Sequence, residues 1–198
     1  MRRIILFTAL AVGLAVGVIV LHGKETPPGF SPYVDAEGNI SIPGDYREWA
    51  FLGSWHLAPE EGAGGAAGAP GFHNVYTQRS SVEAYHKTGK FPDGTVLVKE
   101  LLKTKTGDLT TGRVSWATNV EGWFVMVKDS QGRFPNSPFW GNGWGWVLFS
   151  ADNPKKTVTK NWRTDCLGCH APAKHTDWVF VEGYPVLRSE MVVGRPEH

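Results

Sequence analysis

The amino-acid sequence predicts an α+β fold, in which a single domain has a mainly antiparallel β-sheet and a few short helices. Along most of the chain, short runs of β-branched, aliphatic and aromatic residues alternate with turn residues, which is typical of antiparallel strands joined by short connections. No stretch has a hydrophobic repeat long enough for a helix of a four-helix bundle. These two observations favour a sheet over a helical bundle.

The composition fits one domain of ordinary size. The chain has 198 residues, and its 20 basic and 19 acidic side chains give a net charge of +1, so no basic excess indicates a nucleic-acid partner. Nine Trp, ten Phe and five Tyr make the chain rich in aromatic side chains. These suit both a flat hydrophobic cofactor and a Trp-rich β core, and the composition is compatible with either.

The first 23 residues are typical of an export segment. Two arginines precede an apolar run over residues 4–21, which is long for a signal peptide and just long enough to span a membrane. We therefore expect a signal peptide or an N-terminal membrane anchor over residues 1–23, followed by a proline-containing linker over residues 24–34. Either kind of segment places the domain, residues 35–198, outside the cytoplasm.

In the first half of this domain, strands alternate with turns and one short helix. Ser80 or Ser81 is the expected N-cap of the helix, and Gly89 is its expected stop. The predicted elements are a turn (35–39), a short strand (40–42), a segment that begins as a helix and ends as a strand (47–52), a Gly- and Ala-rich loop (60–71), a strand (72–77), the helix (82–88) and a turn (91–94).

The next predicted strand, residues 95–102, carries an informative alternation. Because successive side chains point to opposite faces of a strand, Lys99 shares one face with Thr95, Leu97 and Leu101. A lysine among such neighbours is usually a surface residue whose aliphatic stem packs on the sheet while its ammonium group reaches water.

The remainder of the chain is predicted to return to strands and loops before a short helical stretch. In the strand over residues 140–149, glycines between tryptophans permit the close approach of another group. The other predicted elements are a polar hairpin loop (103–111), a strand (123–128), a loop (129–138), a helical stretch (155–165) and two closing segments (175–181 and 184–187).

The pentapeptide Cys166-Leu-Gly-Cys-His170 is the attachment signature of a c-type haem. In such a motif the thiols of Cys166 and Cys169 add across the two vinyl groups of the porphyrin, and His170 ligates the iron. The chain has no further cysteine, so both thiols are available for this attachment. A zinc site that adds His175 to these three residues is a rival interpretation. A thioredoxin-like pair would instead follow the first strand of a βαβ unit.

Further sequence blocks stand in a fixed order around this motif. With it, they make residues 35–188 resemble the cytochrome P-460 family of mono-haem c-type cytochromes. The blocks are Tyr46-Arg-Glu-Trp49, Val75-Tyr76, Lys87-Thr-Gly-Lys-Phe-Pro-Asp-Gly94, Val98-Lys-Glu-Leu101, Val127-Lys-Asp-Ser-Gln131, Lys160-Asn161, Thr176-Asp-Trp-Val-Phe180 and Tyr184-Pro-Val-Leu-Arg188.

This resemblance implies a largely β homodimer in the periplasm whose five-coordinate haem has an open distal face. The family's cross-linking lysine lies in a Val-Lys-Glu-Leu block, which places a covalent bond to the porphyrin edge at Lys99. The implied activity is the oxidation of hydroxylamine to nitrous oxide or nitric oxide, with a periplasmic electron acceptor such as a c-type cytochrome. Hydroxylamine and nitric oxide are therefore the expected small nitrogenous partners.

The chain departs from the family pattern at two distal positions. Phe124 occupies the slot of the distal glutamate of the hydroxylamine oxidisers, and His73 occupies the slot of a distal arginine. We therefore expect the remaining candidates for a proton-accepting base to be His73, which ordinarily titrates near neutral pH, and Glu121, three residues before Phe124.

Two alternative functions remain open at this point. A distal phenylalanine is similar to the sister group, cytochrome c-prime-beta, which binds nitric oxide and lacks the lysine bond. A simple electron carrier would instead need a strong sixth ligand, and Met126 and Met191 are the methionines outside the export segment. Methionine is more often a filler of hydrophobic cores.

Overall fold

The computed structural model describes residues 30–58 and 69–188. The export segment, most of the linker, most of the Gly- and Ala-rich loop and Met191 lie outside the described residues. In the described part of the chain, no helix combines the length and apolar character needed to cross a membrane.

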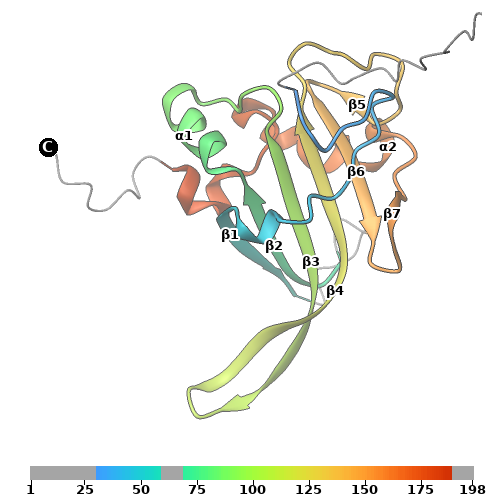
Figure 1. Cartoon of the computed structure of the whole chain (residues 1–198). Coiled ribbons are helices and arrows are strands. Elements are labelled where there is room, and N and C mark those ends of the chain that lie inside the picture. The colour runs from blue at the N-terminus through green and yellow to red at the C-terminus, as the bar shows by residue number, and fades with distance from the viewer. Residues whose placement is uncertain (1–29, 59–68, 189–198) are drawn as a thin grey trace, which may run out of the picture.

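The described chain forms a seven-stranded antiparallel sheet in the order β1-β2-β3-β4-β6-β5, with β7 also paired to β6 (Figure 1). This confirms the predicted fold class. The strands are β1 (Ala50–Leu57), β2 (Gly71–Thr77), β3 (Val96–Leu109), β4 (Gly112–Lys128), β5 (Trp140–Gly141), β6 (Trp144–Ser150) and β7 (Asn153–Thr157).

The helices of the described chain are all short. Helix α1 ends at Gly89, as predicted, because glycine readily adopts the left-handed conformation found there, with φ 69°. Its start was predicted wrongly, because the N-cap is Gln78 and neither Ser80 nor Ser81. The helices are η1 (Tyr46–Glu48), α1 (Arg79–Thr88), α2 (Trp162–Asp165), α3 (Leu167–His170), η4 (Ala171–Thr176), η5 (Val181–Gly183) and η6 (Pro185–Leu187).

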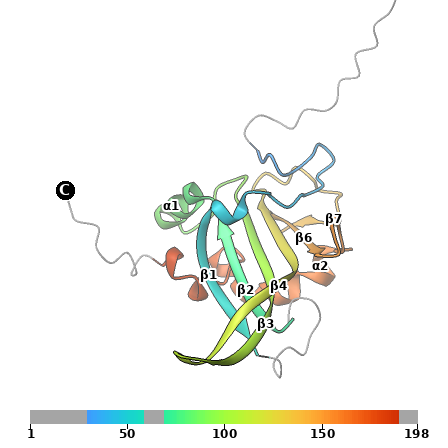
Figure 2. The ribbon, with the colours of Figure 1, turned by 60° about the horizontal axis from the view of Figure 1, so that its bottom comes forward.

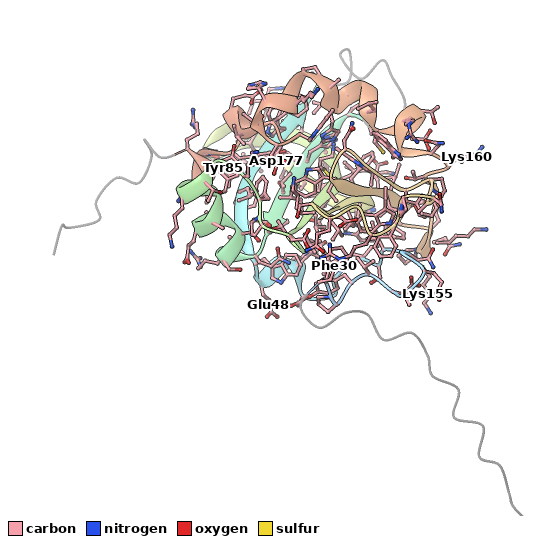
Figure 3. All side chains as sticks on the ribbon, turned by 90° about the horizontal axis from the view of Figure 1, so that it is seen from above. Phe30, Glu48, Tyr85, Lys155, Lys160 and Asp177 are labelled. Carbon is pink, nitrogen blue, oxygen red and sulfur yellow. The ribbon has the colours of Figure 1, made fainter. Side chains whose placement is uncertain are left out.

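The sheet separates two apolar layers, as strand alternation requires. Leu97, with Met126 and Trp146 of neighbouring strands, packs against the helical segments that follow Trp162. The intervening residues of the same strands, such as Val98, pack against the segment that begins at Phe30. Figure 3 shows the two layers on opposite sides of the sheet, with Phe30 labelled in one and Asp177 in the other.

Strands β3 and β4 are longer than predicted and form an arm, residues 103–121, that projects from the sheet (Figures 1 and 2). The predicted polar loop over residues 103–111 is therefore wrong, because the turn consists of Thr110 and Thr111 alone. The arm is polar because it has no core to cover. Cross-strand pairs such as Thr106 Oγ1 and Ser115 Oγ, 2.8 Å apart, support the ladder instead.

Three other predicted elements are corrected by the structure. Residues 40–42 form no strand, and Ile40 makes an isolated bridge to Val34. The strand predicted over 140–149 is divided into β5 and β6 by a two-residue turn at Asn142 and Gly143, both with positive φ. The helical stretch predicted over 155–165 is helical only from Trp162, and its first residues belong to β7.

Candidate haem-binding site

A cavity of about 450 Å³ lies between the sheet and the helical layer. Its volume falls within the roughly 300–1,000 Å³ that is usual for ligand and cofactor pockets. Aromatic and aliphatic side chains dominate its wall. The sheet contributes Trp55, His56, Leu57, His73, Val75, Leu97, Lys99, Phe124, Val125, Met126, Trp146 and Val147, and the helical layer contributes Asp165, Cys166, Cys169, His170, Val179, Phe180 and Tyr184.

Helices α2 and α3 bring the whole pentapeptide motif to this cavity. Helix α2 starts where the side chain of Asn161 accepts a hydrogen bond from the Arg163 N–H, at 2.9 Å. The helical path continues through the motif, since the N–H of His170 donates to the carbonyl of Cys166 at 3.3 Å. Residues spaced by three and four share one face of a helix, so Cys166, Cys169 and His170 all line the cavity.

The alternative zinc ligand set is not assembled. In the described residues, no group of three or more His, Cys, Asp or Glu side chains is gathered closely enough to hold a metal ion directly. His175, the fourth member of that set, is exposed and points Nδ1 at the carbonyl of Pro172, 3.1 Å away. The two thiols are free, and burial raises the pKa of the Cys166 thiol to about 12.

His170 is oriented as a ligand would be. Its Nδ1 lies 2.8 Å from the carbonyl oxygen of Trp178, and since a carbonyl can only accept, Nδ1 carries the proton. The lone pair of Nε2 is therefore free for a metal. Burial is the main cause that lowers the pKa of His170 to about 4, which keeps the ring neutral, and Trp146 packs edge-on against it at 4.9 Å between ring centroids.

Lys99 reaches the same cavity from β3. It pairs in register with Val75 on one side and Phe124 on the other, and its Nζ lies 4.5 Å from the centroid of the Phe124 ring. None of the described residues forms a hydrogen bond or an ion pair with this ammonium group. Burial lowers the pKa of Lys99 to about 8, against the opposing effect of the nearby thiols, so a fraction of the amine is uncharged at neutral pH.

The distal candidates differ in position. Phe124 and His73 both line the cavity, whereas Glu121 does not, and its carboxylate lies 3.6 Å from the ammonium of Lys103. His73 is buried, and its Nε2 donates to the carbonyl of Ala69 at 3.0 Å. Burial, with the positive charge of Lys99 as the next cause, lowers its pKa to about 4. The expectation that His73 titrates near neutral pH is therefore corrected.

Sequence reasoning missed the aromatic part of the wall. Trp55 of β1 and Tyr184 lie 6.1 Å apart between ring centroids, and Phe180 completes the group beside the imidazole of His170. The high aromatic content of the sequence was the available indication, but composition does not predict which aromatic side chains contact one another. Met126, the methionine considered as a sixth ligand, also lines the cavity from β4.

The residues present fit a c-type haem. Two free thiols and a neutral imidazole with a free Nε2 lie on the wall of a largely apolar cavity, which suits a flat hydrophobic ring. Lys99 adds a nucleophilic amine in the same cavity with no hydrogen-bond partner among the described residues. No arrangement of described side chains suggests a different metal site.

The chain matches the model of a known protein family. The family model described as Cytochrome P460 matches residues 43–181, which is more than two thirds of the chain and includes every strand of the described residues and the whole pentapeptide. A search of the curated proteins finds no match.

Proposed function

The chain belongs to the cytochrome P460 family and is therefore a c-type haem protein, and we propose that it is a periplasmic enzyme that oxidises hydroxylamine slowly, to nitrous oxide or nitric oxide. The observation that carries the proposal is the cavity in which His170, the two thiols and Lys99 meet. For the alternative electron carrier, Met126 of β4 does line the cavity, but it packs in the apolar cluster, which is the usual role of methionine.

In this proposal Cys166 and Cys169 would hold the haem by thioether bonds, and Nε2 of His170 would ligate the iron. When bound, the haem supplies an iron centre that accepts electrons and binds a small nitrogenous substrate. Trp55, Phe180 and Tyr184 form an aromatic part of the cavity wall, and apolar surroundings of this kind strengthen electrostatic interactions.

Lys99 is the proposed cross-linking residue. Its Nζ lies inside the haem cavity, and its lowered pKa leaves part of the amine uncharged and nucleophilic. A lysine whose ammonium group reached water would have neither property. The proposal replaces the surface-lysine interpretation and agrees with the Val98-Lys-Glu-Leu101 block of the sequence.

Slow turnover follows from the residues at the two distal positions, Phe124 and His73, although His56 also lines the cavity. Oxidising hydroxylamine removes protons from nitrogen, and a positioned base contributes about 10²–10⁴-fold to such a step. The ring of Phe124 cannot accept a proton. Nδ1 of His73 can, but a group with a pKa of about 4 is a weak base at neutral pH. Asp165, the one carboxylate on the described wall, already accepts the N–H groups of Lys160 and Asn161.

The same observations favour a second candidate, a nitric-oxide-binding protein with little or no turnover. Phe124 lies in the cavity where a glutamate would serve as the base. A haem face bordered by Phe124 suits a small uncharged ligand such as nitric oxide. The two candidates share the haem site and differ in whether bound hydroxylamine is oxidised.

The periplasmic location, the c-type cytochrome acceptor and the homodimer remain proposals. For the homodimer, one observation is relevant. In the described chain, the outer edges of the β3–β4 arm pair with no further strand, and an open strand edge can pair with a second copy. Sedimentation velocity of the purified domain measures the oligomeric state.

A steady-state assay with hydroxylamine and an artificial electron acceptor tests the enzymatic proposal. We expect slow, haem-dependent turnover, with nitric oxide and hydroxylamine both perturbing the absorption spectrum. Spectral evidence of hydroxylamine binding together with no electron delivery to the acceptor would contradict the enzyme and support the nitric-oxide binder.

A further inference from the structure

The turn at Asp177 and Trp178 holds the imidazole of His170. The carbonyl of Trp178 accepts the Nδ1 proton of His170 at 2.8 Å, so the direction of this carbonyl sets the direction of Nε2. Asp177 and Trp178 have φ values of 58° and 69°, a left-handed conformation that residues other than glycine adopt rarely. Two consecutive residues in this conformation require surroundings that hold them there.

Asp177 is fixed by contacts with separate segments of the chain. Its Oδ1 lies 2.6 Å from Nζ of Lys128, and its Oδ2 accepts the backbone N–H of Phe91 at 3.0 Å. Its backbone carbonyl accepts from the indole Nε1 of Trp144 at 3.1 Å. Within the helical layer, the backbone N–H groups of Asp177 and of the next residue both donate to the carbonyl of Ala173.

The cation in this arrangement comes from the sheet. Lys128 is the last residue of β4, and its side chain and that of Asp177 are only 10% and 9% exposed. Its Nζ also lies 4.9 Å from the centroid of the Trp144 ring. A buried ion pair of this kind is weak evidence for stability, because desolvation opposes the attraction, whereas in some proteins such groups serve to specify one conformation.

We propose that the Lys128–Asp177 pair positions the proximal histidine. The pair holds the left-handed turn so that the carbonyl of Trp178 meets Nδ1 of His170. A strong acceptor on Nδ1 raises the basicity of Nε2 and fixes the plane of the ring, which is how outer-shell partners tune a metal ligand. Lys128 and Asp177 are positioning residues, since neither lines the haem cavity. The inference rests on the proposed role of His170 as the iron ligand.

The test uses holoprotein and two substitutions. Lys128→Met keeps the length of the side chain but removes the charge, and Asp177→Asn keeps an acceptor for the N–H of Phe91 but weakens the bond to Lys128. The readouts are the iron–histidine stretching frequency of the reduced protein and its midpoint potential. We expect a lower frequency and a higher potential in both variants, and a tenfold to 100-fold weaker binding of the histidine to the iron, the usual scale of an outer-shell effect.

Arg133→Met is the matched control. Arg133 also pairs with two carboxylates, those of Asp93 and Asp129, but it lies outside the haem cavity. The Arg133→Met substitution should lower the stability of the folded protein without changing the iron–histidine stretching frequency or the midpoint potential. A further variant, Lys128→Met combined with Asp177→Gly, should recover the parental frequency in part, because glycine adopts φ 58° without an anchor. This variant also covers the case in which Lys128→Met alone fails to fold.

The outcomes separate the inference from the proposed function. Haem-loaded variants with the parental frequency and potential would overturn the positioning role, as would an equal shift in the Arg133→Met control. If the parent protein itself showed no iron–histidine band, the assignment of His170 as ligand would fall, whatever the variants did.

Discussion

The ammonium nitrogen of Lys99 lies 4.5 Å from the centroid of the Phe124 ring, inside the cavity that Cys166, Cys169 and His170 also line. The phenyl ring provides no negative charge to stabilise the ammonium form, and burial lowers the pKa of Lys99 to about 8. It also leaves the haem face without a carboxylate at this position. In the proposed function, Phe124 therefore favours cross-linking by Lys99 and slows proton removal from the substrate.

Phe124→Glu should raise hydroxylamine turnover. A carboxylate at this position supplies a general base, and the expected gain is on the order of 10²-fold, the lower end of the usual effect. The measurement is kcat with an artificial electron acceptor. Phe124→Leu is the control, because it changes the shape of the wall without adding a base. A gain in Phe124→Leu equal to that in Phe124→Glu would contradict the proposed lack of a base.

His73→Ala should reduce the residual turnover of the natural protein by about tenfold or more without changing the haem absorption spectrum. Nδ1 of His73 is an available acceptor on the cavity wall, because its Nε2 donates to the carbonyl of Ala69. Glu121→Gln is the matched control, since Glu121 lies outside the cavity beside Lys103. Unchanged activity in His73→Ala with a loss in Glu121→Gln would assign the base to Glu121.

The stability of the folded protein should depend on pH through His73. Burial lowers the pKa of His73 from 6.5 to about 4, with Lys99 and His56 as additional positive neighbours. The unfolded chain therefore takes up a proton below pH 6.5, while the folded protein does so only near pH 4. The stabilisation by neutral His73 is present above pH 6.5 and is lost as the pH falls towards 4, by at most about 3 kcal/mol.

Chemical denaturation of the holoprotein at pH 7.5 and pH 5 checks this pH dependence. His73→Gln removes the titrating group and should lose less stability over the same interval. Since His170 is present in both proteins, its contribution cancels in the comparison. Equal losses in the two proteins would show that His73 has an ordinary pKa in the folded state.

Haem should stay attached to the protein in acidified organic solvent, because thioether bonds to Cys166 and Cys169 survive that extraction. Each single Cys→Ala variant keeps one thioether bond. In a double Cys→Ala variant, any haem still attached must be held by Lys99. Complete release of haem from the natural protein would contradict covalent attachment at the motif.

The sequence was sufficient for the features that depend on local pattern. Alternation in β3 correctly placed Lys99 on the same face of the strand as Leu97, and this face lines the cavity. The pentapeptide lies on the wall of the same cavity. The β3–β4 arm was missed because strand prediction relies on apolar alternation, and an arm such as that around Thr106 covers no core.

Other features depend on tertiary contacts that no local pattern contains. The lowered pKa of His73 results mainly from burial in the cavity, whose wall combines the sheet with the helical layer. The left-handed turn at Asp177 was not predictable, because such turns are usually recognised by a glycine, and this one has none. Its aspartate instead pairs with Lys128 of β4.

The central claim is that one haem lies in this cavity, bonded both to the motif and to Lys99, and mass spectrometry of the digested holoprotein tests it most directly. We predict a single haem-containing species that joins the peptide of Lys99 to the peptide of Cys166 and Cys169. In Lys99→Arg, that species should lose the β3 peptide and keep the motif peptide. A stoichiometric amount of free Lys99 peptide from the natural holoprotein, separate from the haem peptide, would contradict the claim.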